Sequence, residues 1–224
     1  MTAVQPDIDT QDEGLDDLLR RVDPDRWLSS RFIGDLRARA GVEAVYAFDH
    51  ELARAPRVAS NPLLGEMRLA WWREVLDEAF EARAVRRHPT AQALAAAIAG
   101  HGLARPSLEA LIDARYRELD EAPMDAAEAL EFARETGGGV AVLAARILDP
   151  AHDPEPARAA GALWALWKRD GDDAALRAEA KRGASRLTPA GFPAVAHAAL
   201  ARGRAGSDLG RRLRITWAVA RGRV

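Results

Sequence analysis

The chain has 224 residues, of which 48% are hydrophobic and 29% are charged, enough for one globular domain with a single core. Its 32 basic and 34 acidic side chains give a formal net charge of −2, so we expect no nucleic-acid partner, because such binding depends on neutralising phosphates. The absence of cysteine excludes disulfides, thiolate metal sites and cysteine nucleophiles, and it is typical of a reducing compartment such as the cytoplasm.

The domain boundaries follow from charge and from proline. Residues 1–24 are predicted to form an acidic, partly disordered lead-in, and residues 25–224 are predicted to form one domain. No apolar run approaches the roughly 18 to 20 residues of a membrane span, so the chain is predicted to be cytoplasmic and at most peripheral to a membrane.

The first third of the chain has helical periodicity. Leucines and a valine predict a short helix that stops near Pro24, and a second helix is expected to end before Gly41. Apolar residues then follow helical spacing from Val42 to Pro56. The next helix is predicted to run from Ser60 or Asn61 towards Phe80, because a side-chain oxygen can cap the first amides and proline at position 62 suits the first turn.

The remaining elements are predicted to be helical as well, which makes the protein all-α. They are expected at about 90–100, 106–119, 125–137, 140–147, 157–168, 174–182, after Pro189 and at 207–220. Gly137, Gly138 and Gly139 interrupt this pattern. Since each glycine costs a helix about 1 kcal/mol relative to alanine, the triplet indicates either a break or a close approach of two backbones.

Common catalytic signatures are missing from the sequence. The five histidines are scattered without metal-ligand spacing, and neither a nucleophile elbow nor a phosphate-binding loop is present. The tryptophans stand near apolar residues at helical spacing, which favours core packing, although a lipid-lined cavity would use the same side chains: Trp71, Trp72, Trp164, Trp167 and Trp217.

A family resemblance starts at residues 46–54, which read YAFDHELAR. This segment resembles the first active-site helix of the squalene/phytoene synthase family, in a branch where the aspartate-rich motif is replaced. Shorter similarities keep the same order along the chain, at residues 25–28, 65–74, 87–89, 111–115, 131–138 and 213–223. The resemblance implies a single-domain, isoprenoid-synthase-like helical bundle around a central cavity. It places these residues at the cavity: Tyr46, Asp49, Glu51, Arg54, Trp72, Arg115 and Glu118.

Catalytic members of the family join two prenyl diphosphates head to head, and the departing diphosphate needs magnesium held by carboxylates on two facing helices. In this chain the first acidic cluster is replaced by the residues at 52–57. In the second motif only Asp172 remains, as a weak metal candidate, since Leu176 stands where the next aspartate is expected. Glu118 replaces a further aspartate.

Two functions therefore stay open, and enzyme status is uncertain. The first is a non-catalytic protein that binds a prenyl or lipid-like ligand or serves in assembly of a respiratory complex, since the branch resembles a mitochondrial assembly factor of complex I. That reading needs no cofactor. The alternative is a magnesium-dependent prenyl transferase in squalene, hopanoid or carotenoid synthesis.

The C-terminal segment 201–224 holds seven arginines against a single aspartate, Asp208. A helix from Ser207 is predicted to pack an apolar stripe inward and to leave its arginines outside. The inward stripe is expected to comprise Leu209, Leu213, Trp217 and Ala220. The cationic side suits a membrane surface or a membrane-complex partner, or the acidic start of the same chain.

Overall fold

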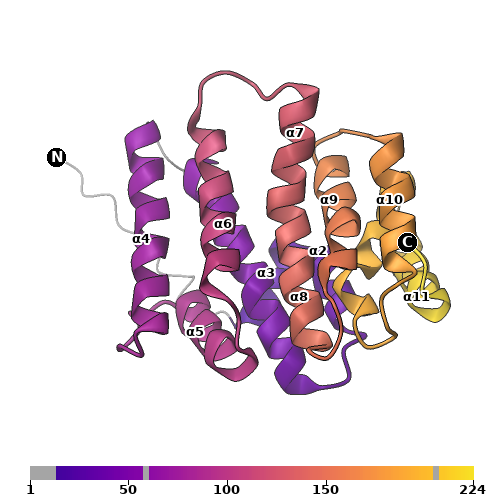
Figure 1. Cartoon of the computed structure of the whole chain (residues 1–224), viewed down its shortest axis with the longest axis horizontal. Coiled ribbons are helices and arrows are strands. Elements are labelled where there is room, and N and C mark those ends of the chain that lie inside the picture. The colour runs from indigo at the N-terminus through magenta and orange to yellow at the C-terminus, as the bar shows by residue number, and fades with distance from the viewer. Residues whose placement is uncertain (1–13, 58–60, 204–206) are drawn as a thin grey trace.

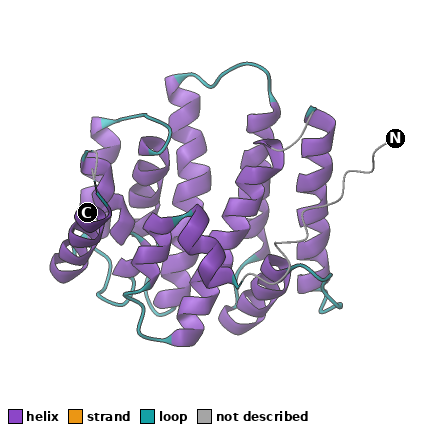
Figure 2. Cartoon of the chain, turned by 180° about the vertical axis from the view of Figure 1, so that it is seen from behind, coloured by secondary structure: helices purple, strands orange, loops and turns teal. Residues whose placement is uncertain are grey.

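The computed structural model describes residues 14–57, 61–203 and 207–224, and within these ranges the regular structure is entirely helical (Figures 1 and 2). The all-α prediction is confirmed. The first 13 residues of the predicted lead-in lie outside the described residues, as do Ser60 and Arg204, one of the seven arginines of segment 201–224. The α-helices are α1 (Leu15–Val22), α2 (Pro24–Ser30), α3 (Leu36–Arg57), α4 (Pro62–Phe80), α5 (Pro89–His101), α6 (Arg105–Arg115), α7 (Ala126–Ala133), α8 (Gly139–Leu148), α9 (Arg158–Trp167), α10 (Ala174–Ala184) and α11 (Asp208–Arg221).

Side-chain caps start several of these helices. Asn61 Oδ1 accepts a hydrogen bond from the Leu64 amide at 3.0 Å. Pro62 occupies the first helical position of α4, so this helix starts where the sequence predicts. Asp23 caps α2 in the same way, and Ser207 caps α11. The helix boundaries are thus set by local chemistry.

Helix α3 is the central element, in contact with α1, α2, α4, α5, α6 and α8. The expected helix end before Gly41 is wrong: α3 continues through this glycine. A Cβ atom there would lie 2.7 Å from Nε2 of His101, so Gly41 allows α5 to approach α3 closely. Packing between the two helices accounts for this glycine, and no chain break is needed.

The glycine triplet also lies within a continuous helical path. A π-helical turn at Arg134–Gly138 joins α7 directly to α8. A Cβ atom on Gly137 would lie 2.7 Å from the carbonyl oxygen of Gly161 in α9, so close backbone approach, one of the two predicted alternatives, is the observed one. Figure 1 shows α4, α6, the α7–α8 pair, α9 and α10 side by side, with α2 and α3 behind them.

The C-terminal region differs from the prediction in two ways. After Pro189 the chain forms two 3₁₀-helices, Phe192–Ala194 and Ala196–Arg202, where one α-helix was expected. In α11 the buried residues are Ile215 and Ala218, so the predicted inward stripe of Leu209, Leu213, Trp217 and Ala220 is wrong, because this stripe points outward. No helix within the described residues is long and apolar enough to cross a membrane.

Candidate functional site

A buried cluster of ion pairs lies between α2, α3 and α6, with Asp49 at its centre. Asp49 is 5% exposed, and its two carboxylate oxygens accept from two different arginines. Arg26 Nη2 is 2.8 Å from Oδ2 and Arg115 Nη2 is 2.6 Å from Oδ1. Arg26 also pairs through Nε with Asp23. Both oxygens of the central carboxylate are therefore engaged by guanidinium groups.

Glu118 extends the cluster towards the surface. Its Oε2 accepts from Arg115 Nη1 and its Oε1 from Arg169 Nη1, both at 2.9 Å. We call the six residues the ion cluster: Asp23, Arg26, Asp49, Arg115, Glu118 and Arg169. Its three carboxylates face three guanidinium groups, so the cluster is neutral as a whole.

Burial and charge act against each other on Asp49. Burial by itself would raise the pKa of its carboxyl group, but Arg115 and Arg26 outweigh this effect and lower the pKa to about 2. Burial similarly opposes the charge on Arg115, whose pKa is nevertheless raised by Asp49 and Glu118. These groups are therefore held in their charged forms at neutral pH.

Aromatic rings enclose the ion cluster on one side. The Arg26 guanidinium lies 5.0 Å from the ring centroid of Tyr46 and 4.8 Å from that of Trp164. Burial raises the pKa of the Tyr46 phenol, and its hydroxyl group has no hydrogen-bond partner among the described residues. Tyr46 thus contributes packing to the cluster.

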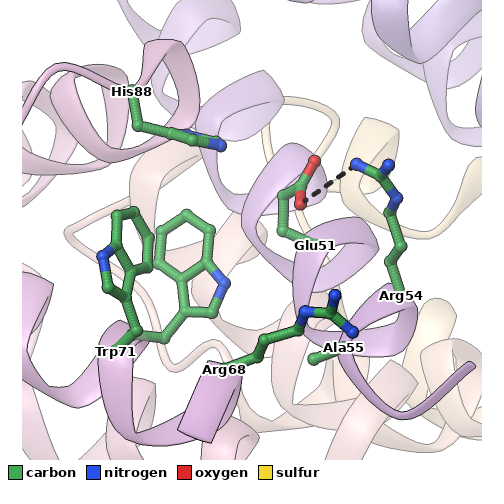
Figure 3. Close-up of a pocket in the computed structure, with 7 residues that line it drawn as sticks. Glu51, Arg54, Ala55, Arg68, Trp71 and His88 are labelled. Atoms are coloured by element: carbon green, nitrogen blue, oxygen red, sulfur yellow. Dashed lines mark ion pairs between the residues drawn. The ribbon is translucent and has the colours of Figure 1, made fainter. Parts of the chain in front are cut away.

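A separate pocket opens beside α3, and Figure 3 shows its lining. It encloses about 280 Å³ between α3, α4 and the start of α5. The two indole rings of Trp71 and Trp72 lie edge to face with centroids 4.9 Å apart, and His88 packs against both. We call this site the tryptophan pocket, lined by Glu51, Arg54, Ala55, Arg68, Trp71, Trp72 and His88.

An adjoining pocket of about 440 Å³ shares three residues with the tryptophan pocket, namely Glu51, Arg54 and His88. Its further lining combines aliphatic side chains of α1 with cationic and polar groups, and includes Leu15, Leu18, Val22 and Arg87. Together the two pockets are lined by aromatic side chains, aliphatic side chains and several arginines.

The charge of the tryptophan pocket is positive. Arg54 approaches Glu51 only to 3.9 Å, and Arg68 has no acidic side chain within 4.0 Å among the described residues. Burial lowers the pKa of His88, which favours its neutral form. Two arginines therefore face one carboxylate across the pocket.

The structure divides the predicted site residues into two groups. Asp49, Arg115 and Glu118 are joined by ion pairs in the ion cluster, and Tyr46 packs against Arg26 of the same cluster. Glu51, Arg54 and Trp72 line the tryptophan pocket.

Several residues of both sites lie outside the predicted set. Asp23 and Arg26 stand three residues apart at a helix start, which is a recognisable i,i+3 pair. Arg68 stands one helical turn before Trp71 and Trp72, which indicates a shared face. Arg169 gives no comparable signal, because its partner Glu118 is 51 residues away.

Asp172, the weak metal candidate, is exposed at the surface. Its side chain is 70% exposed, and it pairs with Arg177. Within residues 14–57, 61–203 and 207–224 no three or more histidine or acidic side chains are grouped so that they could hold a metal ion.

Comparison with known proteins agrees with this architecture. The chain is 29% identical over 133 residues to NADH dehydrogenase (ubiquinone) complex I, assembly factor 6, from Bos taurus. 

The match covers 59% of this chain and 39% of the bovine protein. The match therefore spans well under half of that relative's length.

A family model describes a larger part of the chain. The model of squalene/phytoene synthase matches residues 19–169, a range that runs from within α1 to just past the end of α9 and includes every residue of the ion cluster and of the tryptophan pocket. The chain therefore belongs to the squalene/phytoene synthase family.

Proposed function

We propose that this chain is a non-catalytic member of its family that binds an anionic prenyl or lipid-like ligand in the tryptophan pocket. The observation that carries the proposal is the position of Asp49 between Arg26 and Arg115, at 2.8 and 2.6 Å. A carboxylate whose two oxygens already accept from buried guanidinium groups is a poor ligand for a metal ion.

The donor set does not fit the magnesium ions on which head-to-head condensation depends. A cation at Asp49 would have to displace a buried arginine from one of its two carboxylate partners, and breaking a buried ion pair costs about 3 to 5 kcal/mol. Glu118 is engaged by Arg115 and Arg169, and Asp172 is exposed and paired with Arg177. We therefore propose no metal cofactor.

The lining of the tryptophan pocket favours binding of a ligand that keeps its diphosphate. Guanidinium groups such as those of Arg54 and Arg68 make bidentate contacts with phosphate oxygens. The indole rings of Trp71 and Trp72 offer apolar surface to a hydrocarbon chain. The aliphatic residues of α1 continue that surface into the adjoining pocket.

Native mass spectrometry with farnesyl diphosphate or geranylgeranyl diphosphate, with and without magnesium, tests this proposal. We expect a one-to-one complex that does not require magnesium and is weakened at least tenfold by Arg54→Gln with Arg68→Gln. The matched control is Arg83→Gln, which removes an exposed arginine outside the pocket. Magnesium-dependent formation of squalene or phytoene, or binding that the pocket variant leaves unchanged, would contradict the proposal.

The bovine relative supports a second proposal, that the chain acts in the assembly of a respiratory membrane complex. In that role the protein would work in the cytoplasm, at the periphery of a membrane. Deletion of the gene in its native cells, followed by native gel electrophoresis of respiratory complexes, tests this role. Accumulation of incomplete complex I supports it, and unchanged complex I contradicts it.

A further inference from the structure

Helix α11 presents an apolar ridge to the outside of the domain. Leu209, Leu213 and Trp217 follow one another at four-residue spacing and are 66%, 61% and 60% exposed. The opposite side of the helix carries the buried residues Ile215 and Ala218 and packs on α2 and on the 3₁₀-helix Ala196–Arg202. The ridge therefore points away from the core.

Arginines flank this ridge on both sides. At about 100° per residue, Arg212 lies on one side of the ridge and Arg214 and Arg221 lie on the other. The Arg221 guanidinium stands 4.0 Å from the ring centroid of Trp217. Asp208 is the single acidic residue of α11, and Arg212 pairs with it at 2.9 Å.

We propose that α11 docks on the surface of an anionic lipid bilayer. The ridge would enter the boundary between headgroups and acyl chains, and the flanking arginines would contact lipid phosphates. A helix that joins leucine and tryptophan on one face to arginines beside it has the composition of an interfacial membrane helix. Tryptophan in particular favours the membrane interface.

The charge pattern favours lipid over a second copy of the chain. Two α11 helices packed ridge to ridge would bring their flanking arginines together, and Asp208 is the one carboxylate that each helix could offer in return. An anionic bilayer instead supplies negative charge along both sides of the ridge. Each arginine near such a surface contributes about 1 kcal/mol, or roughly fivefold in partitioning, so binding should be reversible and sensitive to salt.

Co-sedimentation with vesicles tests the proposal on the full chain. The probes are vesicles of phosphatidylcholine alone and of phosphatidylcholine mixed with phosphatidylglycerol. We expect binding to the anionic vesicles that high salt weakens and that Leu213→Ser with Trp217→Ser reduces at least tenfold. Arg214→Gln with Arg221→Gln should also reduce it, by roughly 25-fold if both arginines contribute fully.

The matched control is Leu63→Ser with Met67→Ser on α4, which removes two apolar side chains that are 63% and 60% exposed. Helices α4 and α11 lie at opposite ends of the domain (Figure 1). The proposal would be overturned if the α4 control no longer bound anionic vesicles while the α11 variants still bound them. So would a failure to bind anionic vesicles, or a dimer that the Leu213→Ser, Trp217→Ser variant dissociates while vesicles bind no protein.

Discussion

Arg115 donates from Nη2 to Asp49 Oδ1 at 2.6 Å across a separation of 66 residues, and this contact ties α6 to the central helix α3. Arg26 holds the other oxygen of the same carboxylate from α2. Three helices thus depend on one buried negative charge. The ion cluster is therefore a structural element of the fold.

Substitution Asp49→Asn should destabilise the domain by about 3 to 5 kcal/mol, because it removes the carboxylate that two buried guanidinium groups share and leaves each of them with one acidic partner in place of two. Urea denaturation followed by circular dichroism measures the change. The matched control is Asp172→Asn, whose exposed pair with Arg177 should contribute no more than about 1 kcal/mol. Equal effects of the two substitutions would contradict the assigned role of Asp49.

Stability should fall in acid with a contribution from Asp49. Its pKa is about 2 in the folded chain and 3.8 in the reference state, so its stabilising contribution is present above pH 4 and is lost as the pH falls towards 2. The loss amounts to about 2 kcal/mol. Denaturation at several pH values should show a smaller acid-induced loss in Asp49→Asn than in the unsubstituted chain. Parallel pH profiles would argue against this titration.

Substitution Gly161→Ala should destabilise the domain by about 1 to 3 kcal/mol despite the higher helix propensity of alanine. The new Cβ atom would collide with the carbonyl oxygen of Gly137 and the Cβ atom of Ala141. Gly100→Ala is the control, since no atom lies within 4 Å of its added Cβ, and it should stabilise by about 0.5 to 1 kcal/mol. Thermal melting of both variants decides whether close packing requires Gly161.

Substitution Tyr46→Phe should leave stability unchanged or raise it by about 1 kcal/mol. The hydroxyl group is buried without a hydrogen-bond partner among the described residues, so its removal relieves a desolvation cost and keeps the ring against Arg26. Urea denaturation measures the effect. A loss of more than about 1 kcal/mol would show that the hydroxyl group makes a stabilising hydrogen bond.

Much of the fold could be predicted from sequence, because helix patterns and caps are local. Asn61 followed by Pro62 predicts the start of α4, since a side-chain oxygen and a fixed backbone angle act within one turn. The glycine triplet indicates close packing as one of two alternatives. Gly41 shows the limit of such reasoning, because its need for space comes from His101, 60 residues later.

The amino-acid sequence by itself determined the helical class, most helix boundaries, the family resemblance and the replacement of the acidic motif at 52–57. Only the tertiary structure decided which charges pair in the ion cluster, since the partners of Asp49 come from helices far apart in sequence. It also decided which side of α11 faces the core. Periodicity defines a stripe on a helix, but contact with α2 and Ala196–Arg202 selects Ile215 and Ala218 for burial and leaves Leu209, Leu213 and Trp217 outside.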